Sequence, residues 1–151
     1  MEYKHHSIYT NLAVSRKKIH FKMKLNTQIK LNAYFSVIFG CLIIMGETYR
    51  RFGDFGHWSR WMDDYIIGLL LIVPAIIILK GKNQGVKFLI AGWGFASGLL
   101  YGSFFSKWLD IENIKQSNIE SDLLIKLIGL GLLTSLFGLI WTIIIENKRT
   151  N

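Results

Sequence analysis

Apolar residues of this chain gather in four long blocks, and most of its charged residues lie between and outside them. The blocks cover residues 31–46, 65–79, 88–105 and 127–145. None shows the polar stripe at helical spacing that a soluble amphipathic helix presents to water. Each block is apolar around its whole circumference, and a chain of 151 residues has too little other protein to bury four such helices. The pattern therefore predicts burial in lipid.

Block length decides whether a helix can cross a bilayer, because a membrane-spanning helix needs about 20 mainly apolar residues. The third and fourth blocks have this length, and the first two reach it if their helices continue into the charged stretch between them. Strands of a membrane barrel would alternate polar and apolar residues, which these blocks do not. We therefore predict an all-α integral membrane protein whose domain at 31–147 is an up-down bundle of four transmembrane helices, with approximate spans 31–49, 61–79, 87–106 and 124–146.

Lys and Arg concentrate on one side of the predicted membrane, which in membrane proteins is the cytoplasmic side. Twelve lie before the first block, between the second and third, or after the fourth: Lys4, Arg16, Lys17, Lys18, Lys22, Lys24, Lys30, Lys80, Lys82, Lys87, Lys148 and Arg149. Five lie on the opposite side: Arg50, Arg51, Arg60, Lys107 and Lys115. The remaining one, Lys126, lies inside the fourth predicted span, 124–146. This bias predicts that both termini are cytoplasmic, and with the compact chain it favours a bacterial inner membrane.

Residues 1–30 form a polar, basic segment without sustained periodicity, which we predict to be a poorly ordered cytoplasmic segment. Basic residues beside a membrane attract anionic lipid by about 1 kcal/mol each. The net charge of +8 is therefore interpreted as a topology signal and a contact for anionic lipid, with no nucleic acid partner. A start of translation at Met23 stays open as an alternative to Met1.

Cys41 is the only cysteine, so neither a disulfide within the chain nor a cysteine metal cluster is expected. The string IFGC at 38–41 resembles a lipoprotein cleavage box. Phe39 is bulky for that box and the apolar run continues after it, so an uncleaved first helix is favoured over lipidation of Cys41. The sequence contains no P-loop, no GxSxG nucleophile and no HExxH zinc helix, so no metal or cofactor is predicted. An enzyme that acts on a lipid or periplasmic substrate through the charged stretch at 46–65 is the least favoured of the functions considered.

The third block carries three glycines at four-residue steps in the string AGWGFASGLLYGSFFS, residues 91–106. Steps of four advance about 400° around a helix, so Gly94, Gly98 and Gly102 form one nearly continuous groove. Small residues let membrane helices approach closely. The groove predicts helix packing, either with a second copy or another membrane protein, or within the chain against Ser36 and Gly40 or the row Gly131, Ser135 and Gly138.

The charged stretch GETYRRFGDFGHWSRWMDDY at residues 46–65 has two interpretations. In the structural one, Trp58, Trp61 and Tyr65 mark the membrane boundary. Asp63 and Asp64 lie in the first turn of the second predicted helix, where the positive end of the helix dipole stabilises carboxylates. Glu47 pairs with nearby arginines. In the functional one, carboxylates at the ends of adjacent antiparallel helices face one another at a low-dielectric boundary. The candidate ligand-binding residues are Glu47, Arg50, Arg51, His57, Asp63 and Asp64.

Two functions follow from these features. The first is a helix-packing subunit or accessory protein that acts through the glycine groove. The alternative is a small-solute transporter or ligand-binding membrane protein that uses the charged stretch. The size and four-span layout are similar to those of small multidrug transporters, which carry an essential membrane glutamate in the first helix, and to DoxX-like membrane proteins. Glu47 stands at the end of its block and not in the middle, so this resemblance of layout implies transport only as the alternative.

Overall fold

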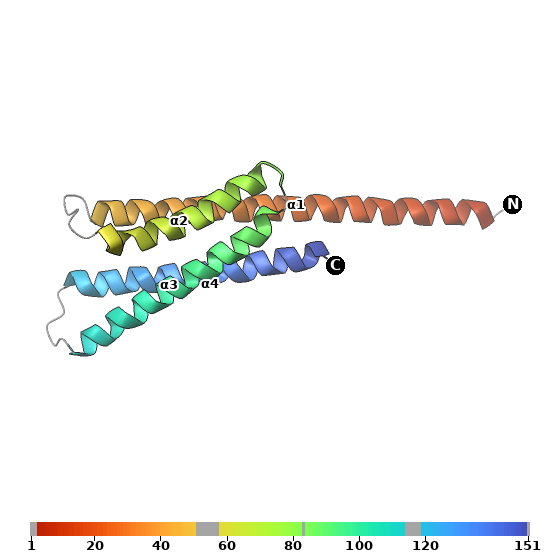
Figure 1. Cartoon of the computed structure of the whole chain (residues 1–151). Helices are drawn as coiled ribbons and strands as arrows, with labels where there is room; N and C mark the ends of the chain where they lie inside the picture. The colour runs from red at the N-terminus through yellow and green to blue at the C-terminus, as the bar shows by residue number, and fades with distance from the viewer. Residues whose placement is uncertain (1–2, 51–57, 83, 114–118, 151) are drawn as a thin grey trace.

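The computed structural model describes residues 3–50, 58–82, 84–113 and 119–150. These residues form four α-helices: α1 Tyr3–Arg50, α2 Trp58–Leu79, α3 Gly85–Asn113 and α4 Ile119–Thr150 (Figure 1). Each predicted span lies inside one of them, so the prediction of an all-helical chain is confirmed.

All four helices are long and apolar enough to cross a membrane, through Leu25–Tyr49, Met62–Leu79, Gly85–Leu109 and Leu123–Thr150. Lipid offers the backbone no hydrogen-bond partner, so an apolar segment of this length forms a helix, which pairs its own N–H and C=O groups. Large apolar side chains cover the outside of every helix, among them Leu42, Leu69, Phe88 and Leu133. An apolar surface of this extent is typical of an integral membrane protein.

Helix α1 extends well beyond the bundle at its N-terminal end (Figure 1). We expected residues 1–30 to be poorly ordered, but the backbone from Tyr3 onward is described as a continuation of the first membrane helix. The reason is that residues 1–30 contain neither Gly nor Pro. Once the apolar span has formed a helix, adding each further residue is easier than starting a new one.

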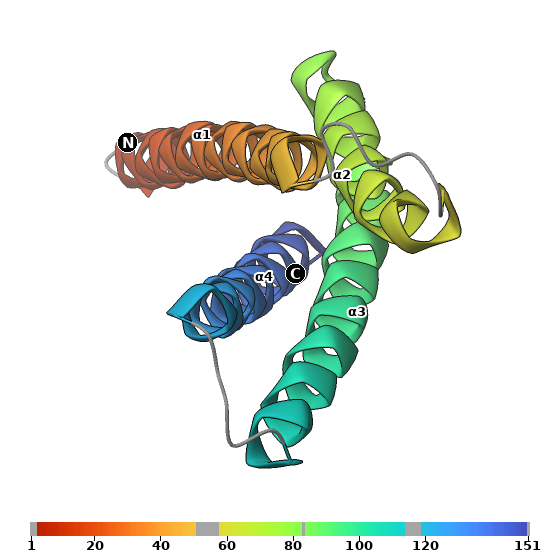
Figure 2. The ribbon, with the colours of Figure 1, turned by 90° about the vertical axis from the view of Figure 1, so that its left-hand side faces the viewer.

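Each helix packs against its neighbours in the sequence, and α1 also packs against α4, which closes the bundle. Figure 2 looks along the bundle and shows α1 and α4 on one side, with α2 and α3 on the other. In Figure 1 the N- and C-terminal ends of the chain lie toward the same end of the bundle. The end of α1 and the start of α2 lie at the opposite end.

The centre of the bundle is built around Trp93 of α3, whose side chain is fully buried. The rings of Phe35 and Phe39, from α1, stack on the indole with centroids 5.7 and 5.4 Å away. Gly138 of α4 lies against the same indole, and a Cβ there would come within 2.6 Å of the ring. Only glycine leaves room for the tryptophan, so this contact sets how closely α3 and α4 approach.

The backbones of α1 and α2 meet at Gly40 and Gly68. A Cβ on Gly40 would lie 2.9 Å from the carbonyl oxygen of Gly68, and one on Gly68 would lie 3.0 Å from that of Gly40. Such reciprocal crowding shows that the absence of both side chains lets the two helices touch.

Pro74 interrupts the hydrogen-bond ladder of α2 because it has no N–H to donate to the carbonyl of Leu70. Gly92 of α3 packs so closely on that carbonyl that a Cβ would collide with its oxygen. The next carbonyl, of Leu71, accepts a hydrogen bond of 3.0 Å from the hydroxyl of Ser36 in α1. Neighbouring helices thus cover the turn that the proline disturbs, as membrane proteins require.

Helix α2 ends in a Schellman motif at Gly81, which adopts a φ of 80°. The N–H of Lys82 donates to the carbonyl of Ile77 at 3.1 Å, and that of Gly81 to Ile78 at 2.8 Å. These two bonds satisfy carbonyls at the helix end, and glycine is the residue that adopts the left-handed conformation most easily.

Candidate functional site

The last turns of α1 and the first turns of α2 form one end of the bundle, here called the Glu47 end. Glu47 is buried there, with only 5% of its surface exposed. The hydroxyls of Thr48 and Tyr65 lie 2.7 Å apart and link α1 to α2. Either hydroxyl can be the donor in this link, and the hydroxyl of Thr48 also lies 2.7 Å from the carbonyl oxygen of Ile44.

The other candidate residues of the charged stretch are placed differently. Asp63 is exposed and Asp64 is half-buried in the first turns of α2. Arg50 ends α1, but its side chain is outside the described part of the structure, as are Arg51 and His57 entirely. The structure therefore gathers Glu47, Thr48 and Tyr65 at one place, with Asp64 on the adjoining helix.

Thr48 was not singled out by the sequence, which offers only a hydroxyl next to Glu47 as a signal. Tyr65 is predicted as a boundary ring, and its hydrogen bond adds a role in fixing the ends of two helices. The Glu47 end is thus a buried carboxylate beside a bonded pair of hydroxyls. Within the described ranges, no group of three or more His, Cys, Asp or Glu side chains could hold a metal ion.

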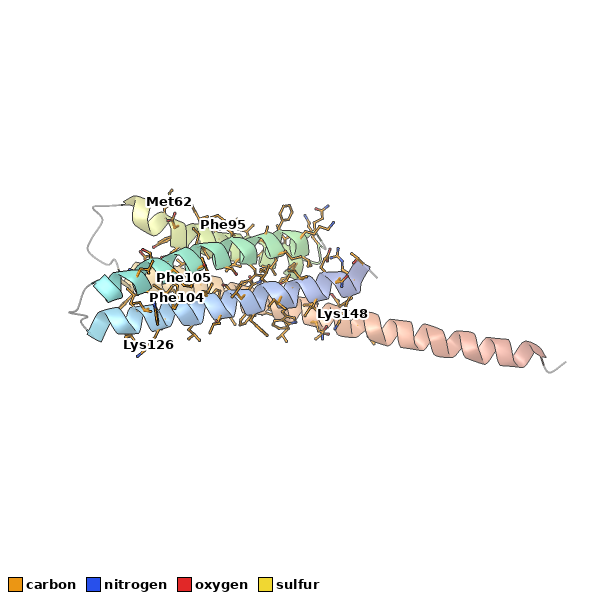
Figure 3. All side chains as sticks on the ribbon, turned by 90° about the horizontal axis from the view of Figure 1, so that it is seen from below. Met62, Phe95, Phe104, Phe105, Lys126 and Lys148 are labelled. Atoms are coloured by element: carbon orange, nitrogen blue, oxygen red, sulfur yellow. The ribbon has the colours of Figure 1, made fainter. Side chains whose placement is uncertain are left out.

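The glycine groove of α3 faces outward. No described atom other than those of its own helix backbone and chain neighbours lies within 4 Å of where a Cβ would stand at Gly94, Gly98 or Gly102. All three glycines are exposed, and Phe95, Tyr101 and Phe105 beside them are exposed too. Phe95 and Phe105 are labelled in Figure 3 on α3.

The proposed partners of the groove within the chain pack elsewhere. Gly40 meets Gly68 of α2, and Gly138 meets Trp93 on a different face of α3. The sequence left open whether the groove packs within the chain or against another molecule. Among the described residues, no other helix of the chain packs on it.

A second group consists of polar side chains buried between the helices: Asn32, Ser97, Ser135 and Thr142. Of these, the sequence pointed only to Ser135, as a small residue for helix packing. The hydroxyl of Thr142 in α4 lies 3.2 Å from Oδ1 of Asn32 in α1, and that of Ser97 in α3 donates to Ser135 in α4 at 3.1 Å. Their only signal in the sequence is a polar residue inside or beside an apolar block. They are separated by up to 110 positions, so no local pattern pairs them.

Glu146 lies one turn beyond Thr142 on α4, at the end of the bundle opposite the Glu47 end. Its carboxylate is buried, and Nε of Arg149 lies 3.3 Å from Oε2. Lys148, exposed on the same last turns, is labelled in Figure 3. Glu47 and Glu146 thus place one buried carboxylate near each end of the helical bundle.

Comparison of the chain with models of known families, with curated proteins and with solved structures gives no match.

Proposed function

We propose that this chain is a small multi-pass protein of a bacterial inner membrane and acts by association, through the glycine groove of α3 packing on a second copy of itself. Its four helices cross the bilayer alternately up and down, with both termini in the cytoplasm. The apolar helices support the membrane location. The excess of Lys and Arg on one side supports the orientation. The basic residues before the first span contact anionic lipid.

The proposed association is supported by the position of the groove, which no other described helix covers. Inside the chain, glycines are used where helices touch, at Gly40, Gly68, Gly92 and Gly138. Gly94, Gly98 and Gly102 form a regular row at four-residue steps, yet no atom of another described helix lies within 4 Å of where their Cβ atoms would stand. A lipid-facing helix gains nothing from three glycines, whereas a partner helix gains close backbone contact.

A second copy is the favoured occupant because the groove is apolar and flat. Residues 88–106 contain no charged residue, so the partner must itself be an apolar membrane helix. Two copies of one small-residue groove can face each other across a twofold axis, since each offers the other room for its backbone. Another membrane protein as partner is the alternative outcome.

The test is to measure the oligomeric state of wild type and Gly98→Leu in nanodiscs or mild detergent over a range of protein concentrations. We expect Gly98→Leu to weaken dimerisation by about tenfold or more, which corresponds to about 1.4 kcal/mol. Its unfolding midpoint should match that of the wild type at dilutions where both are monomeric, because no described neighbour within the chain is displaced. Gly46→Leu is the matched control, since Gly46 is also exposed and open but lies on α1.

A wild-type protein that stays monomeric at every concentration, and captures no membrane partner through α3, contradicts the proposal. Equal dimerisation of wild type and Gly98→Leu places the contact on another surface.

Binding of a small solute at the Glu47 end is the second candidate function, through Glu47, Arg50, Arg51, His57, Asp63 and Asp64. The burial of Glu47 favours it, because carboxylates held at membrane depth are commonly functional. Thermal unfolding with ions, lipids and metabolites should reveal a compound that stabilises wild type but not Glu47→Gln. Lys87→Gln, an exposed charge on another part of the molecule, is the control. If Glu47→Gln is less stable and no compound separates it from wild type, the Glu47 end only clamps α1 to α2.

A further inference from the structure

Glu146 in the last turns of α4 carries a carboxylate that is shielded from solvent, with 13% of the side chain exposed and both oxygens buried. Nε of Arg149 makes an ion-pair contact of 3.3 Å with Oε2. No described residue donates a hydrogen bond to either oxygen. Removing a carboxylate from water is strongly unfavourable unless positive charge and hydrogen bonds compensate it. One ion-pair contact from the same helix compensates this group only in part.

Further oxygen atoms lie along the same face of α4. Gly138, Thr142 and Glu146 follow one another at four-residue steps, so they form a row along one side of the helix. The hydroxyl of Thr142 lies 2.6 Å from the carbonyl oxygen of Gly138 and 3.2 Å from Oδ1 of Asn32. The single hydroxyl hydrogen of Thr142 is shared between these two acceptors, and the contact with Asn32 brings oxygen atoms of α1 and α4 together.

Hydrogen bonding that holds the helices together is the rival explanation for buried polar groups. It accounts for Ser36, Ser97 and Ser135. The hydroxyl of Ser36 reaches the carbonyl of Leu71, and the hydroxyls of Ser97 and Ser135 reach backbone carbonyls of their own helices. It does not account for Glu146, because an apolar side chain would pack there without the loss of hydration.

We propose that Glu146, Thr142 and Asn32 bind one alkali-metal ion, Na⁺ or K⁺, in the seam between α1 and α4. Carboxylate, hydroxyl and amide oxygens are the hard ligands that such cations prefer. The ion neutralises the carboxylate, and the C-terminal end of α4 adds negative partial charge at the same place. Arg149 contacts Oε2 and leaves Oε1 for the ion, so it acts as a competing positive charge. This site is separate from the α3 groove and does not depend on association.

The experiment uses the full chain in nanodiscs, with NaCl or KCl compared with choline chloride at the same ionic strength. The first readout is the thermal unfolding midpoint. The second is the reaction of Glu146 with dicyclohexylcarbodiimide, mapped by mass spectrometry, because an ion on the carboxylate protects it. We expect Na⁺ or K⁺ to raise the midpoint and to slow the labelling of Glu146, and choline to do neither.

Variants assign the ligands. Glu146→Gln should abolish the stabilisation by the alkali-metal ion, and Glu146→Asp keeps a carboxylate in case the glutamine variant folds poorly. Thr142→Val and Asn32→Ala should raise the cation concentration for half-protection by about tenfold or more. Arg149→Gln should lower it, because the competing charge is gone. An ion pair with a purely structural role predicts the opposite for Arg149→Gln, a loss of stability without any gain in cation binding.

Two variants serve as controls for the site. Ser135→Ala removes another buried hydroxyl of α4, and Lys87→Gln removes an exposed charge of α3. Both should keep the response to the cation. The proposal is overturned if alkali-metal ions and choline act alike on the wild type, or if Glu146→Gln keeps the response. It is also overturned if labelling follows pH alone, which would make the carboxylate a proton site instead.

Discussion

Two faces of helix α3 carry glycines and have opposite surroundings. On one face Gly92 rests on the carbonyl of Leu70, next to Trp93, which fills the centre of the bundle. On the other face Gly94, only two residues later, begins a row with Gly98 and Gly102 that touches none of the other described helices. The more regular glycine pattern is thus the one that the single chain does not use.

The difference shows what a glycine spacing means in a membrane helix. A row of small residues states that another backbone can come close, but it does not say which backbone. Gly92 matters inside the chain because Pro74 leaves a carbonyl without its helical donor, and that carbonyl lies on a different helix. No feature of the sequence around Gly92 distinguishes it from Gly94.

The largest expected effect separates these two glycines directly. Gly92→Ala places a methyl group on a backbone oxygen that cannot rotate away, so we expect a loss of about 3 kcal/mol in the free energy of unfolding. Gly94→Ala, with no described neighbour, should change it by less than about 0.5 kcal/mol. Unfolding by denaturing detergent in mixed micelles measures both. Equal losses for the two variants would show that the faces do not differ.

A second comparison uses the glycines of α4 that face α3. Gly138→Ala presses on the indole of Trp93, which Phe35 and Phe39 hold in place, and should cost about 2 kcal/mol. Gly131→Ala brings its methyl group only to ordinary contact, 3.8 Å from the methyl groups of Leu100, and should be nearly neutral. The same unfolding assay distinguishes them. A neutral Gly138→Ala would mean that Trp93 can shift.

The smallest expected effect tests the polar link on the inner face. Ser97→Ala removes the hydrogen bond of 3.1 Å to Ser135, and buried bonds between membrane helices contribute about 0.6 kcal/mol. Ser103→Ala, an exposed serine of the same helix, should have no effect on unfolding. The double variant Ser97→Ala with Ser135→Ala should cost less than the sum of the two single changes, because they share one bond. Additive losses would show that the two hydroxyls act independently.

Much of the fold could be predicted because it depends on local properties. Each of the four apolar blocks corresponds to one described helix, and each predicted span lies inside that helix. The basic composition of residues 1–30 led to the prediction of a poorly ordered segment, whereas the described backbone is helical from Tyr3 onward in a stretch without Gly or Pro. In the candidate site, Glu47 is buried at the end of α1. The hydrogen bond between its neighbours Thr48 and Tyr65 joins two helices and could not be predicted from the sequence.

The sequence by itself determined that this chain forms four helices suited to lipid, because the bilayer requires long apolar segments that pair their own backbone groups. Only the tertiary structure decided which side of each helix faces inward. The blocks are apolar all around, so no stripe marks the packed side. Lipid tails are as apolar as leucine, so a leucine gains no hydrophobic free energy by moving from lipid to a neighbouring helix. Contacts such as Asn32 with Thr142 and Gly138 with Trp93 therefore depend on shape between distant segments.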